Sequence, residues 1–157
     1  MAKSKIRIGI LGAGAMGSEH AAVYRAIEGV EVAGVSSRNF ERAVAAARIC
    51  NAKPVTDPFL LIDDPTIDAI DVCLPTIDHR EFVVAALQRG KHVFCETPFA
   101  LSLSDAAAMS EAARNSNRIL LVGLLVRSIA EYEHAHRVAT SGEFGKLLSI
   151  TAYRLGS

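Results

Sequence analysis

An α/β fold with a doubly wound parallel sheet is predicted for this chain by three observations. Short apolar runs rich in β-branched residues alternate with helical patterns along the sequence. The first run, residues 6–11, leads directly into the glycine-rich segment Gly12–Gly17, and a helical pattern follows at once. Half of the 157 residues are hydrophobic and 22% are charged, a composition that favours one globular domain with a sizeable core. Alternation of this kind places the strands parallel and covers both faces of the sheet with helices.

The elements follow from local patterns, taken in chain order. Strands are expected where short apolar runs end at turn residues, over 6–11, 31–35, 53–55, 67–74, 91–95 and 119–122. Helices are expected over 18–27, 39–49, 58–62, 80–88, 104–115 and 131–140. Asn39 is the expected N-cap of the second helix, and Asp57 is expected to cap the short third one, where Pro58 suits the first turn. Gly29 and Gly90 end the first and fourth helices.

The segment Gly12–Gly17 has the spacing G-x-G-x-x-G between a strand and a helix. Gly12 permits the tight turn out of the strand, Gly14 lets the backbone approach a pyrophosphate, and Gly17 lets the helix pack close to the strand. The free N–H groups at the start of the helix offer partial positive charge to a phosphate. Because the strand and helix flank the motif, a dinucleotide site is preferred over a plain glycine-rich turn.

Charge and cysteine usage exclude several classes of protein. Lys plus Arg and Asp plus Glu each number 17, so no global field favours nucleic acid or an anionic membrane as a partner. Cys50, Cys73 and Cys95 form no C-x-x-C pair and are expected to be reduced thiols, with Cys73 and Cys95 in the core rather than acting as nucleophiles. The five histidines lack metal-site spacing, so no metal is expected. Without a signal peptide or an apolar run of about 20 residues, a cytoplasmic location is expected.

The end of the second strand indicates which dinucleotide is bound. An NAD site of this type is expected to carry a carboxylate about 20 positions past the glycines, which holds the ribose 2′-OH. Here the segment is Ser36-Ser37-Arg38, with two hydroxyls and a guanidinium. Arginine makes charge-assisted bidentate contacts with phosphate, so NADP is preferred over NAD.

Ligands bind at the carboxyl ends of the strands in open parallel sheets. That rule gathers Gly12–Gly17, Ser36–Arg38, Leu74–His79 and Glu96–Pro98 at one edge. Four features follow one another along the chain. They are the glycine motif, the Leu74–His79 segment with its histidine four residues after Pro75, the block G-K-H-V-F-C-E-T-P at 90–98, and the segment Ser141–Gly145. In these features the chain resembles the N-terminal half of the glucose–fructose oxidoreductase, inositol dehydrogenase and rhizopine catabolism (Gfo/Idh/MocA) family.

The resemblance implies NAD(P)-dependent oxidation or reduction of a sugar, polyol or related carbonyl compound. It implies a Rossmann domain followed by an α/β domain with a large open antiparallel sheet. It also implies that Leu74, Pro75, Thr76 and His79 line the nicotinamide side of the pocket, and that Glu96 contacts the cofactor ribose. The full set of expected cofactor-binding residues is Gly12, Gly14, Ala15, Met16, Gly17, Ser36, Ser37, Arg38, Leu74, Pro75, Thr76, His79, Glu96 and Thr97. His20 and Glu19 on the first helix are expected to be surface residues.

Thr97 stands where the family usually carries a catalytic lysine. A threonine hydroxyl forms hydrogen bonds but does not exchange protons near neutral pH, so the catalytic residue stays unknown. Two alternatives to a dehydrogenase therefore stay open. One is an NAD-dependent glycoside hydrolase of the same family, because certain members lack this lysine. The other is a non-catalytic dinucleotide-binding or assembly module, because the substrate domain is largely absent.

The expected organisation is a Rossmann domain over 1–123, a connecting helix region over 124–145 and the first strand of a truncated substrate domain over 146–157. The alternation of Lys146–Arg154 predicts a strand, which needs a partner to satisfy its backbone. Its apolar residues favour association, so a homo-oligomer is expected, or a chain that is a fragment of a longer protein.

Overall fold

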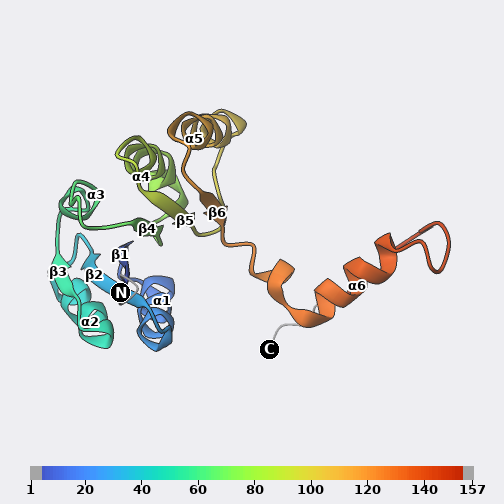
Figure 1. Ribbon diagram of the computed structural model, residues 1–157, viewed down its shortest axis with the longest axis horizontal. Helices are drawn as coiled ribbons and strands as arrows, with labels where there is room; N and C mark the ends of the chain where they lie inside the picture. The colour runs from blue at the N-terminus through green and yellow to red at the C-terminus, as the bar shows by residue number, and fades with distance from the viewer. Residues whose placement is uncertain (1–4, 154–157) are drawn as a thin grey trace. The chain divides into compact units, whose positions relative to one another are not determined.

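The computed structural model describes residues 5–153, which divide into two units, the first ending at Gly123 and the second beginning at Leu124. The first unit contains a parallel sheet of six strands in the order β3-β2-β1-β4-β5-β6 (Figure 1). The strands are β1 (Ile6–Leu11), β2 (Val30–Ser36), β3 (Lys53–Val55), β4 (Ala69–Val72), β5 (His92–Cys95) and β6 (Leu120–Val122). This is the predicted doubly wound α/β fold, and the order changes direction between β1 and β4.

Helices cover both faces of the sheet (Figure 1). The helices of this unit are α1 (Ala15–Ala26), α2 (Phe40–Cys50), α3 (Phe59–Ile62), α4 (Thr76–Gln88) and α5 (Leu103–Ser116). Ala21 of α1 and Ala46 of α2 pack with Ile10 on one face. On the other face, Val83 of α4 and Met109 of α5 belong to a second apolar cluster. The small alanine side chains let α1 and α2 lie close to the sheet.

Alternation along β4 assigns its side chains to these two faces. Ile70 and Val72 belong to the cluster that α3, α4 and α5 cover, whereas Ala69 and Cys73 pack on the side of α1 and α2. Successive side chains in a strand point to opposite faces, so Asp71 points toward α1. A carboxylate thus lies in the middle of the sheet, with 1% of its residue surface exposed.

The predicted caps are confirmed in α2 and before α3. The Asn39 side chain accepts a hydrogen bond from the Arg42 N–H at 3.1 Å, and the Asp57 side chain accepts one from the Phe59 N–H at 2.9 Å. Helix α4 begins at Thr76, one turn earlier than the predicted start at Arg80. Pro75 lies directly before its first residue, where the missing N–H costs nothing.

The second unit contains a short 3-10 helix, η1 (Leu125–Ser128), and α6 (Ala130–Thr140). The strand predicted over Lys146–Arg154 is not present in the described part of that segment, because residues 146–153 have no regular secondary structure. A strand exists only when its backbone groups pair with a neighbour, and residues 5–153 supply none there. Arg154 and residues 155–157 lie outside the described residues.

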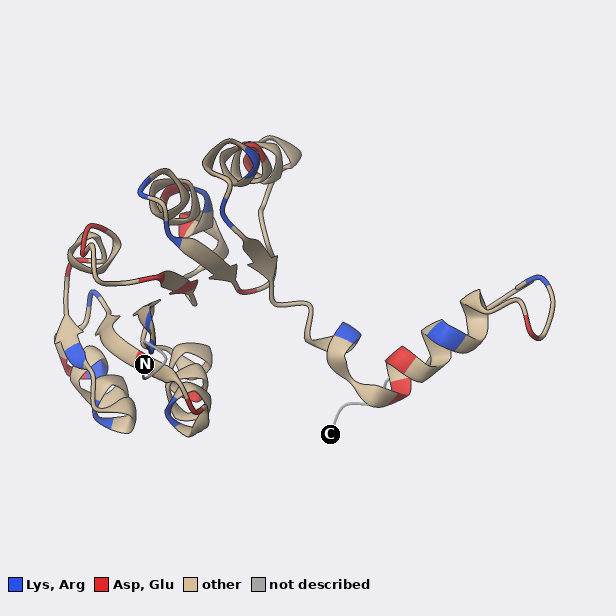
Figure 2. Cartoon of the chain, in the orientation of Figure 1, with Lys and Arg blue, Asp and Glu red and all other residues tan. Residues whose placement is uncertain are grey.

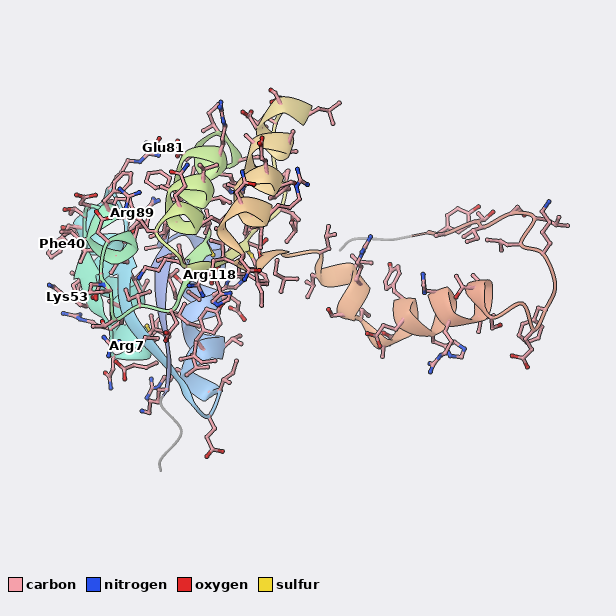
Figure 3. The ribbon with its side chains drawn as sticks, turned by 45° about the horizontal axis from the view of Figure 1, so that its top comes forward. Arg7, Phe40, Lys53, Glu81, Arg89 and Arg118 are labelled. Carbon is pink, nitrogen blue, oxygen red and sulfur yellow. The ribbon has the colours of Figure 1, made fainter. Side chains whose placement is uncertain are left out.

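Acidic and basic positions are interspersed over the helices, as the equal numbers of both signs suggest (Figure 2). Arg89, the C-cap residue of α4 that is labelled in Figure 3, lies over the Phe59 ring of α3 at 5.5 Å from its centroid and pairs with Asp63. Within residues 5–153, no helix combines the length and the apolar character that crossing a bilayer requires.

Candidate functional site

A cleft of about 760 Å³ lies at the carboxyl ends of β1, β2 and β4. Its walls come from the glycine turn, the start of α1, the β2–α2 loop and the start of α4. Nine of the predicted cofactor-binding residues line it: Gly12, Gly14, Ala15, Met16, Ser36, Ser37, Arg38, Leu74 and Pro75. The expected gathering of these segments at one edge is therefore present, whereas Gly17, Thr76, His79, Glu96 and Thr97 are not part of this cleft wall.

The three motif glycines occupy different environments. Gly12 has φ +106°, and a Cβ there would overlap the carbonyl oxygen of Cys73. A Cβ on Gly17 would overlap the carbonyl oxygen of Gly12, so this glycine is needed for the close packing of α1 on the turn. A Cβ on Gly14 would meet nothing within 4 Å, so the space beside this backbone is free for a ligand.

The start of α1 is suited to an anion. Gly14 is the N-cap, and within the described chain no side chain caps the helix and no acidic residue lies in its first turn. The Ser18 N–H is bonded to the Gly14 carbonyl at 3.0 Å, whereas the N–H groups before it have no acceptor one turn earlier in the helix. These groups and the helix dipole attract the negative charge of a phosphate.

The β2–α2 loop and the first turn of α2 each present one arginine to the same cleft. The Arg38 side chain is 85% exposed, and its Nη2 lies 3.8 Å from Oδ2 of Asp78 on α4. Arg42 also lines the cleft, although it was not among the predicted residues. The Asn39 cap places Arg42 in the first turn of α2, and this spacing is the sequence signal that would have identified it. Glu81 of α4, labelled in Figure 3, lines the cleft as well.

Ser36 and Ser37, the two predicted hydroxyl ligands, both line the cleft and have different hydrogen-bond surroundings. Ser36 is buried, and its carbonyl accepts a hydrogen bond from the Gly12 N–H at 2.9 Å. Its hydroxyl has no hydrogen-bond partner among residues 5–153. The Ser37 hydroxyl accepts a hydrogen bond from the Asn39 N–H at 3.3 Å, which supports the loop.

His79 is buried beneath the cleft rather than placed on its surface. Its residue surface is 1% exposed, with Nε2 2.8 Å from the Leu74 carbonyl oxygen and Nδ1 3.2 Å from that of Phe99. The sulfur of Cys95 lies 3.3 Å from the same Nδ1. Burial raises the pKa of Cys95 to about 12, so this residue is a thiol. His79 thus ties the strand-end segment at Leu74 to the loop at Phe99, and in this arrangement its ring does not reach the cleft.

A second polar cluster lies on the α1 face of the sheet. His20 Nδ1 lies 2.8 Å from Oδ2 of Asp71, and His20 Nε2 lies 3.3 Å from Oε1 of Glu96. The Cys73 thiol donates to Oδ1 of Asp71 at 3.4 Å. The expectation that His20 is a surface residue is therefore wrong, because its side chain is only 16% exposed and bridges two carboxylates. Sequence patterns did not reveal this cluster because Asp71 stands inside an apolar run.

The electrostatics of this cluster favour a charged imidazole. The pKa of His20 is raised, above all by its hydrogen bond to Asp71, then by the charges of Asp71, Glu96 and Glu19, while burial opposes the rise. Burial and the charge of Asp71 raise the pKa of Cys73, so its sulfur stays protonated. An imidazolium satisfies both carboxylates, since each of its two N–H groups can donate to one of them.

His20, Asp71 and Cys73 place a nitrogen, an oxygen and a sulfur within 4.8 Å of one another. Tetrahedral zinc with bonds of about 2.0–2.3 Å separates its ligand atoms by more than about 3.2 Å. The His20–Asp71 separation of 2.8 Å is shorter and is that of a hydrogen bond. The geometry therefore describes a hydrogen-bonded network.

Glu96 and Thr97 lie at the carboxyl end of β5. The Glu96 N–H donates to the Val72 carbonyl at 3.0 Å, and Oε2 of Glu96 accepts from the Thr97 N–H at 3.0 Å. Thr97 is exposed. A Cβ on Gly123 would lie 2.9 Å from Oε1 of Glu96, so a glycine leaves room for this carboxylate.

Comparison with known proteins is consistent with this geometry. The family model described as "Oxidoreductase family, NAD-binding Rossmann fold" matches residues 6–124. The chain is 33% identical over 150 residues to the myo-inositol 2-dehydrogenase of Thermotoga maritima, covering 94% of this chain and 45% of the relative. It is 36% identical over 148 residues to inositol 2-dehydrogenase 2 of Saccharopolyspora erythraea, covering 92% and 44%.

Solved structures give the same result. The myo-inositol 2-dehydrogenase of Lactobacillus plantarum matches with a TM-score of 0.83 and 27% identity, over 92% of this chain and 44% of that one. A 3-ketoreductase from Actinomadura kijaniata in complex with NADP matches with a TM-score of 0.81 and 25% identity, over 90% and 46%. The chain thus spans about half the length of the relatives it matches. On the extent of the family match and the fold, the chain belongs to the Gfo/Idh/MocA oxidoreductase family with the NAD-binding Rossmann fold.

Proposed function

We propose that this chain is the cofactor-binding part of an NADP-preferring oxidoreductase that acts on a sugar or polyol. The observation that carries the proposal is one cleft that joins an uncapped helix start to Arg38, after β2, and Arg42, in the first turn of α2. The helix start and the space beside Gly14 fit a diphosphate. Arg38 and Arg42 fit a phosphate on the adenosine ribose, and no carboxylate at Ser36–Asn39 repels it.

Each part of the chain has an assigned task in this proposal. Gly12, Gly14, Ala15, Met16 and Gly17 hold the diphosphate, mainly through the backbone. Leu74, Pro75 and Thr76 line the nicotinamide side, with His79 supporting them from below. Glu96 contacts the ribose next to the nicotinamide, beside Thr97. The cofactor supplies hydride transfer when bound, and these residues orient it.

The class of substrate is supported by the names of the relatives. Several are inositol dehydrogenases, whose substrates are polyols, and one matched structure is a 3-ketoreductase crystallised with NADP. A scyllo-inositol 2-dehydrogenase (NAD(+)) of Bacillus subtilis is 32% identical over 144 residues, so relatives of both cofactor preferences occur. The Ser37–Arg38 pair is our reason for preferring NADP.

We also propose that residues 1–123 form the cofactor domain, that 124–145 connect it to a second domain, and that 146–157 begin that domain. Phe144, Leu148, Ile150 and Tyr153 are exposed apolar or aromatic residues in this region and need a partner surface. A second domain or a homo-oligomer would supply it. The free Cys50, Cys73 and Cys95 suit a reducing compartment such as the cytoplasm.

The deciding experiment is a titration of the chain with NADPH and NADH, in which binding is measured by nucleotide fluorescence or by calorimetry. We expect NADPH to bind more tightly than NADH. Arg38→Asp should reverse this preference, because a carboxylate repels the 2′-phosphate of NADPH and accepts a hydrogen bond from the ribose 2′-hydroxyl of NADH. Arg42→Ala should weaken NADPH about tenfold and leave NADH unchanged. Arg48→Ala is the matched control, since Arg48 is an exposed arginine of the same helix that does not line the cleft. Failure of both nucleotides to bind at millimolar concentration would refute the proposal.

Thr97 supports a second candidate function. Its exposed hydroxyl occupies the position expected for a proton-transferring lysine, and it cannot take that role. An NAD-dependent glycoside hydrolase is the enzyme that fits this substitution. Tight nucleotide binding in a full-length protein that releases sugar from a glycoside, without net reduction of the nucleotide, would favour it over the dehydrogenase.

A further inference from the structure

The buried carboxylate of Asp71 demands a compensating partner. Asp71 lies on the central strand β4, with Ile10 of β1 and Phe94 of β5 as its neighbours in the sheet. An isolated carboxylate in such a position is costly unless it is paired and hydrogen-bonded. The His20 ring at 2.8 Å and the Cys73 thiol at 3.4 Å provide both partners, one for each carboxylate oxygen.

His20 extends this pairing to the edge of the sheet. The ring is held edge-on against Phe94 and Tyr24, with ring centroids 5.6 and 6.2 Å away. With Nδ1 committed to Asp71, its Nε2 faces Oε1 of Glu96 at 3.3 Å. A carboxylate–imidazole–carboxylate line therefore runs from the interior of β4 to the carboxyl end of β5.

Glu96 is held from two further sides. Its other oxygen accepts the Thr97 N–H, and the absent side chain at Gly123 leaves the space that its carboxylate fills. The Glu96 side chain is 15% exposed, so its orientation depends on these few contacts. Among them, the His20 ring is the one that can take up a positive charge.

We propose that His20 is a positioning residue, which acts as an imidazolium anchored by Asp71 to fix the Glu96 carboxylate at the cofactor edge of the sheet. The inference rests on the proposed function, in which Glu96 contacts the cofactor ribose. The charged and titratable groups that face His20 are Glu19 and Tyr24 on α1, Asp71 and Cys73 on β4 and its end, and Glu96 after β5. This set contains three carboxylates and no positively charged side chain, so protonation of His20 is favoured.

The protonation of His20 determines how the network depends on pH. Its folded-state pKa lies above the ordinary value of 6.5. The interaction is therefore complete below pH 6.5 and disappears as the pH rises through the folded-state value. Above that value a neutral ring has one N–H and can donate to only one carboxylate, and the shorter contact with Asp71 keeps it. Glu96 is then released.

The first test measures the network in the cofactor-free 157-residue chain. Long-range ¹H–¹⁵N spectra of the imidazoles between pH 5 and 9 report whether each ring carries one or two protons. We expect one histidine, assigned with His20→Gln, to stay doubly protonated after an ordinary histidine has lost its proton. Asp71→Asn should move its midpoint to lower pH, and His134→Gln, which alters an exposed histidine of α6, should not. If all five histidines of the unmodified chain lose their second proton at an ordinary pH, the proposal is overturned without any variant having to fold.

The second test connects the network to the cofactor. We expect the unmodified chain to lose affinity for NADPH as the pH rises and His20 loses its charge. His20→Gln should weaken NADPH binding about fivefold at pH 6.5 and abolish this dependence on pH. If His20 acts through Glu96, the double variant His20→Gln, Glu96→Gln should bind as Glu96→Gln does. Additive losses would overturn the positioning role. A shifted His20 midpoint together with no NADPH binding at all would support the network and refute the proposed function, so the two failures are distinguishable.

Discussion

The two units of this chain differ most in how much apolar surface they bury. Every buried apolar residue in the described part of the chain precedes Leu124, and none of the residues of η1 and α6 is buried. Both units contain helices of similar length, α2 and α6, with eleven residues each. Helix α2 buries three alanines and has an asparagine cap, whereas within the described chain α6 has neither a buried residue nor a side-chain cap. The comparison shows that helix propensity can form a helix, but only an available partner surface supplies a core.

The largest expected effect comes from removing core volume. Leu87 is fully buried in α4, whereas Leu148 is 90% exposed. We expect Leu87→Ala to lower the free energy of unfolding by about 2–5 kcal/mol and Leu148→Ala by less than about 0.5 kcal/mol, measured by urea denaturation. An equal loss in both variants would mean that residues 146–153 are packed in solution.

Two glycines with positive φ sharpen the same contrast. Gly12 has no room for a side chain because of the Cys73 carbonyl, whereas Gly142 has φ +75° and open space around it. Gly12→Ala should destabilise the first unit by about 1–3 kcal/mol and abolish nucleotide binding. Gly142→Ala strains only its own turn in the second unit, so the stability of the first unit and nucleotide binding should stay unchanged. Thermal unfolding and NADPH titration of the two variants check this, and a tolerated Gly12→Ala would contradict the geometry of the turn.

The cap of α2 should contribute a smaller amount. Asn39→Ala leaves the Arg42 N–H without its acceptor and should cost about 1 kcal/mol. Asn39→Asp is the control that keeps the acceptor. Ile129→Asp would place a capping side chain at the start of α6, and we expect more helical circular dichroism without a change in the unfolding of the first unit. If Ile129→Asp stabilises that unit, the two units are coupled.

The smallest effect concerns pH. Because the folded-state pKa of His20 is raised, its stabilising contribution is complete below pH 6.5 and decreases as the pH rises through that folded-state value. His20→Gln should flatten the dependence of the free energy of unfolding on pH in this range. Denaturant unfolding at several pH values measures this dependence. A profile that stays unchanged would show that His20 titrates equally in the folded and unfolded chain.

Much of the first unit could be predicted from sequence because each signal there is local. The glycine spacing, the Asn39 cap and the apolar run at 6–11 each act within one turn or strand. The partly buried His20–Asp71 pair joins residues 51 positions apart, and no periodicity indicates such a contact. His79 likewise shows that a histidine in a cofactor motif can bind backbone carbonyl groups beneath the cleft and not face the ligand. The strand predicted after Gly145 depends on neighbours that the described residues do not contain.

A backbone hydrogen bond between Gly12 and Ser36 bears on how cofactor preference can change within this family. The Gly12 N–H binds the carbonyl of Ser36, so the turn for the diphosphate and the loop that selects the ribose substituent are joined through main-chain atoms alone. Side chains at positions 37 and 38 lie outside this bond. They can be exchanged without displacing the diphosphate turn, so nucleotide preference can change during evolution while the geometry that holds the common part of the cofactor is inherited intact.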